Sequence, residues 1–225
     1  MRHFDIVKTS DVEKTYRVAK LENDFDLKPN HANEHFVGDL DIDHNWQIGL
    51  IVGGSGTGKT TIARDVFEDN IVSNMVYSHK SVIDDMPNDL SVTEISKMFY
   101  AVGFGSVPSW LKPYSVLSNG EKMRVDIARA ISERDLTVFD EFTSVVDRQV
   151  AQVASLAINK MIRKTEKQFV AISCHHDVID WLAPDWIFDT DQMKFSFTKA
   201  TENHENSQSE NVNVPSGKSL GNIII

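Results

Sequence analysis

The chain has 225 residues, of which 41% are hydrophobic and 25% are charged, so it can bury one substantial core in one or at most two domains. A formal net charge of −10 argues against a broad nucleic-acid-binding surface, and Cys174, the single cysteine, excludes an intrachain disulfide and a four-cysteine metal site. The sequence has no run of about 18 apolar residues and no apolar signal core, so we expect a cytoplasmic protein that does not itself cross a membrane.

The first elements that the sequence predicts are strands. Apolar and polar residues alternate at residues 4–7, 16–18 and 35–37, as they do in antiparallel strands with one buried face. A continuous apolar run at residues 48–52 predicts a buried strand, and residues 60–67 predict a helix after it.

Beyond this helix, residues 75–77 predict another strand. A capping box at Ser91–Glu94 predicts a helix over residues 92–102, and Pro108 and Pro113 predict an extended connection after it. The remaining predicted elements are helices over residues 120–132 and 148–164 and buried strands over residues 136–139 and 169–173.

This alternation of strands and helices predicts an α/β fold, in which a mainly parallel sheet is flanked by helices and has an antiparallel edge. We expect one domain over residues 1–200. Residues 201–225 are rich in Asn, Ser, Glu, Gln and Gly, which cannot bury enough apolar area to order the chain, so we expect a flexible polar tail there.

A phosphate-binding pattern lies between the predicted strand and helix. Residues 53–60 read Gly-Gly-Ser-Gly-Thr-Gly-Lys-Thr, which matches G-x-x-x-x-G-K-[ST]. The glycines let successive N–H groups turn toward the phosphates, and the positive end of the helix favours an anion. Lys59 is expected to reach the β- and γ-phosphates, and the Thr60 hydroxyl to bind Mg²⁺. The expected nucleotide-binding residues of this segment are Gly53, Gly54, Ser55, Gly56, Thr57, Gly58, Lys59, Thr60 and Thr61.

The apolar strand at residues 136–139 ends in two acids, Asp140 and Glu141. A buried strand has no packing reason to end in this way, because both charges need partners. Beside a phosphate loop, Asp140 is expected to bind Mg²⁺ through its water shell. Glu141 is expected to polarise the attacking water or to accept its proton.

Residues 117–130 read Leu-Ser-Asn-Gly-Glu-Lys-Met-Arg-Val-Asp-Ile-Ala-Arg-Ala. This stretch resembles the signature of the ATP-binding cassette (ABC) superfamily, usually Leu-Ser-Gly-Gly followed by Gln or Glu and a helix with Arg-x-x-x-Ala-Arg-Ala. The resemblance implies that Ser118 and Gly120 contact the γ-phosphate of a nucleotide held by the phosphate loop of a second protomer. Asn119 departs from the usual glycine, and taken alone Ser-Asn-Gly also fits a plain helix-starting turn.

Two further motifs follow in the family order. Residues 144–147 (Ser-Val-Val-Asp) are similar to the loop whose aspartate communicates across the dimer interface, and residues 174–177 (Cys-His-His-Asp) to the switch-histidine loop. The resemblance implies that His176, which directly precedes an acid, donates a hydrogen bond to the γ-phosphate, with His175 as the fallback. It covers about residues 35 to 195. It further implies ATP and Mg²⁺ as ligands, a reduced helical subdomain at about residues 78–132, and a head-to-tail dimer that sandwiches ATP.

The chain departs from the transporter members of that family in two respects. No glutamine occurs between Thr61 and Arg148, where transporter cassettes carry a glutamine loop that touches the membrane partner. Asp84 or Asp85 could replace it as a Mg²⁺ ligand, or both could lie in a solvated acidic turn. The interval between the phosphate loop and the signature is also shorter than in transporter cassettes, which weakens a transporter role.

Phe142 stands where the family usually has proline after the acidic pair. With the sequence patterns at residues 140–148 and 176–186, this variant resembles a small bacterial and phage group of cassette ATPases, some of which are described as fused to a predicted acetyltransferase domain. Only 25 residues follow Ala200, so we expect no such domain in this chain.

The sequence therefore predicts a soluble ABC-type ATPase that dimerises on ATP and drives an unidentified protein partner. Glu141, His176 and Lys59 are its expected catalytic residues. Two alternatives stay open, namely an ATP-binding subunit of a membrane transporter and a nucleotide-gated binding module with negligible turnover. Phe25 and Phe36 are the candidates for stacking on adenine, and either could belong to the core instead.

Overall fold

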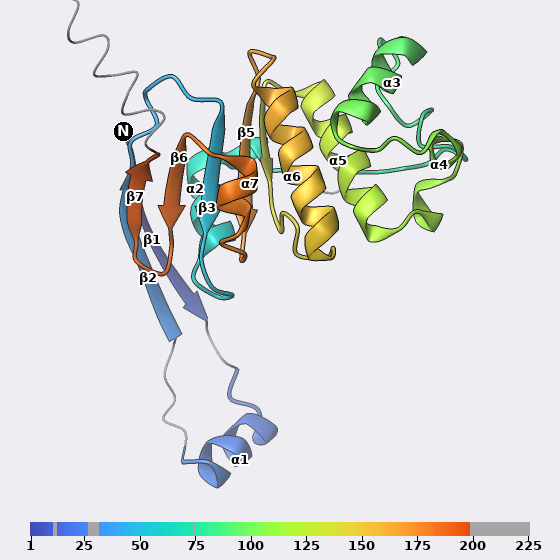
Figure 1. Ribbon diagram of the computed structural model, residues 1–225. Helices are drawn as coiled ribbons and strands as arrows, with labels where there is room; N and C mark the ends of the chain where they lie inside the picture. The colour runs from blue at the N-terminus through green and yellow to red at the C-terminus, as the bar shows by residue number, and fades with distance from the viewer. Residues whose placement is uncertain (11–12, 27–31, 74, 199–225) are drawn as a thin grey trace, which may run out of the picture.

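The structure is a computed structural model that describes residues 1–10, 13–26, 32–73 and 75–198 (Figure 1). The polar tail predicted over residues 201–225 lies outside these ranges. Within the described ranges, no helix is both long enough and apolar enough to span a bilayer.

A five-stranded sheet with the order β4-β5-β3-β6-β7 forms the centre of the fold. β3 (Ile48–Val52) is the middle strand, and all of its residues are buried, as its continuous apolar sequence predicts. It is parallel to β5 (Gln168–Ser173) on one side and to β6 (Trp186–Asp189) on the other. β4 (Leu136–Phe139) is parallel to β5, and β7 (Lys194–Phe197) is antiparallel to β6. The carboxyl ends of four parallel strands therefore share one edge of the sheet.

Both faces of this sheet are covered, and β3 shows how. Ile48, Leu50 and Val52 point into an apolar cluster with five helices, whereas Ile51 points into a second cluster with one helix and an N-terminal hairpin. The helices of the first cluster are α3 (Val92–Ala101), α4 (Val107–Trp110), α5 (Asn119–Glu133), α6 (Arg148–Ile162) and α7 (Val178–Leu182), and the second cluster has α2 (Lys59–Phe67).

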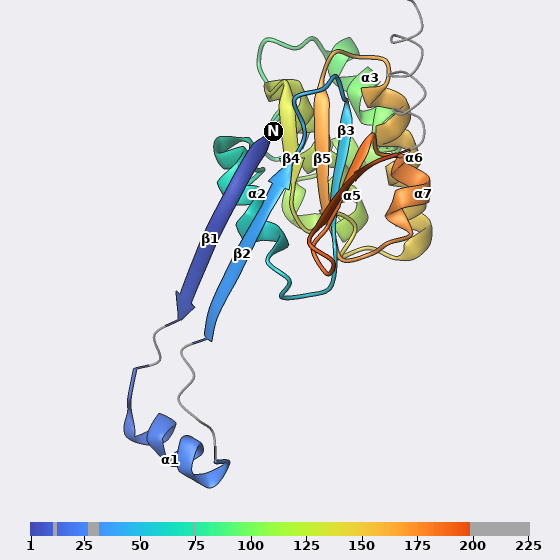
Figure 2. The same cartoon turned by 90° about the vertical axis from the view of Figure 1, so that its left-hand side faces the viewer.

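The N-terminal hairpin consists of β1 (Arg2–Ser10) and β2 (Ala32–Leu40), which are antiparallel. α1 (Tyr16–Asp24) is inserted between them, and none of its residues is buried. The strand predicted at residues 16–18 is wrong, because the Thr15 side chain accepts a hydrogen bond from the Val18 N–H and caps a helix instead. Figure 2 shows the hairpin extending away from the central sheet, with α1 at its far end.

The segment between α2 and α5 differs from the prediction in two places. Residues 75–77 are not a strand. In the described part of this segment, an isolated parallel bridge joins Ile71 to Val138 instead, directly after the short turn η1 (Glu68–Asn70). The extended connection predicted at Pro108 and Pro113 is also wrong. Pro108 lies in the first turn of α4 (Val107–Trp110), where proline is tolerated, and Pro113 precedes a second turn, η2 (Tyr114–Val116).

One contact explains why β3 contains a glycine. A Cβ on Gly49 would lie 2.0 Å from Cζ2 of Trp186, which is fully buried on the neighbouring strand. Only glycine leaves room for the indole this close to β3, so the packing of β6 depends on this position.

Candidate functional site

The predicted site motifs meet at the edge where the parallel strands end. β3 leads into the phosphate loop, β4 into Asp140 and Glu141, and β5 into the histidine loop at residues 174–177. β6, which is also parallel to β3, leads into Thr190 and Asp191. In open α/β sheets such an edge is where ligands bind.

The phosphate loop has the backbone geometry that its glycines allow. Gly56 and Gly58 have φ angles of 82° and 86°, in the left-handed region that favours glycine. Gly58 is the N-cap of α2, so the loop runs directly into the positive end of that helix. A Cβ on Gly56 would meet no atom within 4 Å, so the loop faces open space there.

The Lys59 side chain folds back over this loop. Its Nζ donates to Gly53 O at 2.9 Å and to Gly54 O at 2.5 Å. The ammonium group is therefore already placed on the loop, where it can exchange these carbonyl contacts for phosphate oxygens.

The turn after β6 holds the phosphate loop in place, and the sequence did not predict it. Thr57 Oγ1 donates to Gly54 O at 2.9 Å and lies 2.6 Å from Thr190 Oγ1. The Gly54 N–H donates to both carboxylate oxygens of Asp191 at 3.0 Å. The signal that could have indicated this turn is the polar run Asp189–Asp191, which follows a short apolar stretch as a loop follows a buried strand.

The segment that begins with the second acid of the pair has strained backbone. Glu141 has a φ of 53° and is exposed, and Thr143 has a φ of 66°. Non-glycine residues in this region cost about 1–3 kcal/mol each and cluster at functional sites. The Asp140 carboxylate accepts a hydrogen bond from the Glu141 N–H at 2.9 Å.

Phe142 keeps this strained segment attached to the sheet. Its N–H donates to Ile172 O of β5 at 2.8 Å, a bond that the usual proline could not make. Its side chain is fully buried, with ring centroids 6.4 Å from Phe139 and 5.8 Å from Phe169. The departure from the family pattern thus has a structural role in this chain.

Thr60 and Asp140 are the donors that suit a magnesium ion. Thr60 lies in the first turn of α2, and Asp140 directly follows β4. Across the described residues, no group of three or more His, Cys, Asp or Glu side chains could hold a metal. One hydroxyl and one carboxylate fit Mg²⁺ because this ion takes most of its other oxygens from phosphates and water.

The histidine loop extends from the end of β5. His176 is 55% exposed, and its Nε2 lies 4.0 Å from Asp189 Oδ2 at the end of β6. The backbone N–H of His175 donates a hydrogen bond to Ser173 Oγ at 3.1 Å. Cys174 is exposed, and its Sγ lies 3.6 Å from His175 Nδ1. Of the two histidines, His176 is the one that faces a residue next to the phosphate loop.

The signature segment starts α5. Ser118 is the N-cap, and its hydroxyl accepts from Glu121 N at 3.3 Å and donates to Glu121 Oε2 at 2.9 Å. Asn119 is the first helical residue and needs no left-handed backbone. A Cβ on Gly120 would lie 2.9 Å from Val150 Cγ1 of α6, so glycine is required for close packing. The segment is thus a helix-starting turn, as one of the two interpretations predicts, and its contact with a nucleotide stays a prediction.

The aspartate of the predicted cross-dimer loop also caps a helix. Asp147 is the N-cap of α6, and its Oδ1 accepts from Gln149 N and Val150 N, each at 3.0 Å. Val145, two residues earlier, is 62% exposed. The loop therefore presents an apolar side chain outward from a well-defined helix start.

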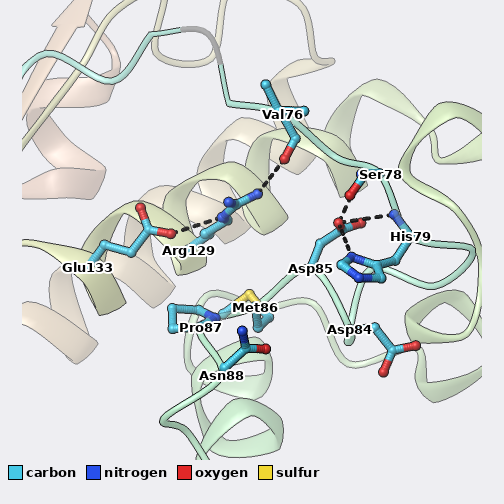
Figure 3. A pocket seen from close by; sticks show the side chains of 10 residues that line it. All are labelled: Val76, Ser78, His79, Asp84, Asp85, Met86, Pro87, Asn88, Arg129 and Glu133. Atoms are coloured by element: carbon cyan, nitrogen blue, oxygen red, sulfur yellow. Dashed lines mark hydrogen bonds and ion pairs between the residues drawn. The ribbon is translucent and has the colours of Figure 1, made fainter.

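Asp85 closes a turn beside a cavity of about 200 Å³ (Figure 3). Its Oδ1 accepts from Ser78 N at 3.0 Å, His79 N at 3.2 Å and His79 Nδ1 at 2.8 Å. Burial alone would raise the pKa of this carboxyl, but the hydrogen bonds outweigh it and lower the pKa. Asp84 is exposed and accepts a hydrogen bond from Ser81. A solvated turn thus describes Asp84, whereas Asp85 is buried.

A second cavity, of about 290 Å³, has Asp126 and Tyr114 in its lining. The hydroxyls of Tyr77 and Tyr114 donate to the Asp126 carboxylate at 2.6 and 2.8 Å, and the two rings stack with centroids 3.9 Å apart. Burial raises the pKa of Asp126 and of both tyrosines. The sequence did not predict this cluster, which joins the segment after α2 to α5.

Of the two candidate adenine-stacking residues, only Phe36 lies beside the phosphate loop. A Cβ on Gly58 would lie 2.5 Å from Cε1 of Phe36, so the ring rests against the last glycine of the loop. Phe25 ends α1 on the hairpin and is 69% exposed. It does not belong to the core.

No protein-family model and no curated protein matches this chain. Among solved structures, a bacterial Atm1-family ABC exporter with ATP bound matches with a TM-score of 0.51 and 21% identity, over 72% of this chain and 35% of the exporter. The chain thus spans about a third of that exporter's length.

The dimeric structure of MJ0796, a bacterial ABC transporter cassette, matches with a TM-score of 0.56 and 14% identity, over 83% of this chain and 92% of the cassette. A post-hydrolysis state of the same cassette, bound to ADP and Pi, matches with a TM-score of 0.55. These likenesses show that the chain has the α/β fold of ABC-type P-loop ATPase cassettes.

Proposed function

We propose that the chain binds ATP with Mg²⁺ at residues 53–61 and hydrolyses it in a site shared by two copies of the chain. The observation that carries this proposal is the meeting of three motifs at one edge of the sheet. The phosphate loop, the acidic pair and the histidine loop all follow parallel strands there. Positioned charges of this kind supply most of the catalysis in phosphoryl transfer.

Each residue at this edge has a role that its position supports. Lys59, already on the loop, binds the β- and γ-phosphates. Glu141, exposed at the end of β4, polarises the attacking water or accepts its proton. His176 donates a hydrogen bond to the γ-phosphate. Mg²⁺, held by Thr60 and Asp140, would neutralise phosphate charge when bound.

Two features support a site that a second copy completes. The phosphate loop is open at Gly56, and Ser118 is exposed at the start of its own helix. Ser118 and Gly120 of one protomer would therefore contact the γ-phosphate held by the other. A similar cassette of known structure is dimeric.

Phe36 is the residue we propose to stack on the base, because its ring adjoins Gly58. The ATPase domain would comprise residues 1–200, with a reduced helical subdomain at about residues 78–132. Closing and opening of the dimer would drive a protein partner that docks elsewhere on the chain. The same ATPase could serve as a transporter subunit, and co-purification with a membrane protein would identify that use.

The test compares the wild type with Glu141→Gln for phosphate release and for ATP-dependent dimerisation by size-exclusion chromatography. We expect the variant to lose turnover and to accumulate as an ATP-bound dimer. Lys59→Ala should abolish nucleotide binding. Glu166→Gln, an exposed Glu-to-Gln change before the opposite end of β5, is the matched control and should behave as wild type.

A Glu141→Gln variant that hydrolyses ATP normally and stays monomeric contradicts both the base and the shared site. Retained nucleotide binding by Lys59→Ala contradicts the phosphate-loop assignment. Nucleotide binding without measurable phosphate release from the wild type identifies a nucleotide-gated binding module instead of an ATPase.

A further inference from the structure

A two-point ion pair joins the loop after β4 to the loop after β5. Arg148 is the first residue of α6, and its Nε donates to Asp177 Oδ2 at 2.9 Å. Its Nη2 donates to the other carboxylate oxygen, Oδ1. Asp177 directly follows His176, so the pair connects the end of the loop at residues 143–147 to the histidine loop.

The guanidinium is held from a second direction by Trp181 of α7. The Arg148 Cζ lies 5.1 Å from the centre of the Trp181 ring. The third nitrogen, Nη1, is buried and has no hydrogen-bond partner among the described residues. A planar guanidinium can make two hydrogen bonds to a carboxylate and stack on an indole at once, which a lysine ammonium cannot. This position therefore requires arginine rather than positive charge alone.

The same turn of α6 also contacts the signature segment. A Cβ on Gly120 would lie 2.9 Å from Val150 Cγ1 and 3.8 Å from Val146 Cγ1. Asp147 holds this turn through its two N-cap hydrogen bonds. The first turn of α6 thus lies between the signature segment and, through Arg148, the histidine loop.

His176 has few restraints of its own. Its imidazole is more than half exposed, and the 4.0 Å separation from Asp189 is too long for a hydrogen bond. Its carbonyl accepts from Ile179 N at 3.0 Å. The direction of the imidazole therefore follows the backbone of its loop, and Asp177 attaches that backbone to α6.

We propose that Arg148 is a positioning residue, which sets the place of His176 through Asp177 and couples it to the loop at residues 143–147. This role rests on the proposed ATPase function. When a second copy contacts the exposed Val145, the first turn of α6 shifts, and Arg148 carries the shift to the histidine loop. His176 then approaches the nucleotide only in the assembled dimer.

A charge-reversal series tests this role by separating turnover from nucleotide affinity. Arg148→Asp and Asp177→Arg should each lower kcat about ten- to a hundredfold, because small misplacements of a catalytic group are costly. Their affinity for a fluorescent ATP analogue should stay within about twofold of the wild type, since neither residue touches the nucleotide. The double variant restores an opposite-charge pair and should recover a kcat above both single variants. The kcat of Arg148→Lys should also stay below that of the wild type, because lysine keeps the charge but cannot bind both carboxylate oxygens of Asp177 through two planar N–H groups.

Lys20→Ala is the control, since it removes another exposed ion pair, Lys20–Asp24 at 3.1 Å on α1. Its kcat should be that of the wild type, and the thermal midpoints of all single variants should resemble its own. Wild-type kcat in both reversed variants refutes the positioning role. A double variant whose kcat does not exceed that of the more active single variant also refutes it. If the wild type hydrolyses ATP and Lys59→Ala abolishes binding, such a result refutes the Arg148 role alone. A wild type without turnover refutes both proposals.

Discussion

Replacing Phe142 with proline, the residue usual at this position in the ABC superfamily, should destabilise this chain strongly. The Phe142 N–H donates to Ile172 O at 2.8 Å, and proline has no N–H. Proline also restricts the residue before it to extended backbone, whereas Glu141 has a φ of 53°. The substitution therefore conflicts with the backbone as well as with the core.

The expected loss can be worked from these contacts. Truncating a buried phenylalanine costs about 3–5 kcal/mol, and the proline ring refills part of that volume. Leaving the buried Ile172 carbonyl without a donor adds about 1–3 kcal/mol. We expect Phe142→Pro to lower the free energy of unfolding by about 4–6 kcal/mol, a large part of the stability of an ordinary domain. Phe142→Leu keeps the N–H and should lower it by about 1–2 kcal/mol.

Urea unfolding followed by circular dichroism measures both losses. Leu111→Ala, at a position that is 67% exposed, is the control and should change the free energy of unfolding by no more than about 0.5 kcal/mol. A loss below about 1 kcal/mol for Phe142→Pro would refute the reasoning. Equal losses for the proline and leucine variants would show that the N–H bond to β5 contributes nothing.

Asp85 should contribute to the loss of folding stability at acidic pH. Because hydrogen bonds lower its folded-state pKa below the ordinary 3.8, its contribution is fully present above pH 3.8 and is lost as the pH falls through the folded-state pKa. Asp85→Asn should cost about 1–3 kcal/mol at neutral pH and flatten the acid side of the stability profile, and an unchanged profile contradicts this account. Phe36→Ala should weaken the binding of a fluorescent ATP analogue about tenfold, whereas Phe25→Ala should not change it. Equal effects of the two would remove Phe36 as the stacking residue.

The elements with a strong repeating pattern could be predicted from the sequence. The run at residues 48–52 is β3, and the helices predicted at residues 92–102 and 120–132 are α3 and α5 within two residues at each end. Buried parallel strands are continuously apolar, and capping boxes mark helix starts, so both signals are local in the chain.

The misses came from short or non-local signals. Three alternating residues at 16–18 fit a strand as well as a helix turn. The segment is helical, with the Thr15 side chain accepting a hydrogen bond from the Val18 N–H as its N-cap. Residues 75–77 are apolar enough for a strand, but Tyr77 instead stacks on Tyr114 and binds Asp126 of α5. The last two strands, β6 and β7, were not predicted. Each has only four residues, and neither is followed by an acidic pair like the one that marks the end of the equally short β4.

The candidate site also combines local motifs, which the sequence reveals, with long-range contacts, which it does not. Its motifs are contiguous in the chain, so Lys59, Asp140 and His176 could be named as candidates from the sequence alone. The contacts that support them join distant residues, and no local pattern reports them. Asp191 binds Gly54 across 137 residues, and Arg148 binds Asp177 across 29.

The exposed thiol of Cys174 has a practical consequence. It is the chain's single cysteine and lies two residues before His176. A thiol-reactive spin label therefore attaches to the unmodified sequence at one place, beside the loop whose movement is in question. A monomer then carries one spin and a dimer carries two, so an inter-spin distance is measurable only after assembly. The histidine loop thus carries its own site for a spectroscopic label, and the proposed ATP-dependent dimerisation can be tested without changing a residue.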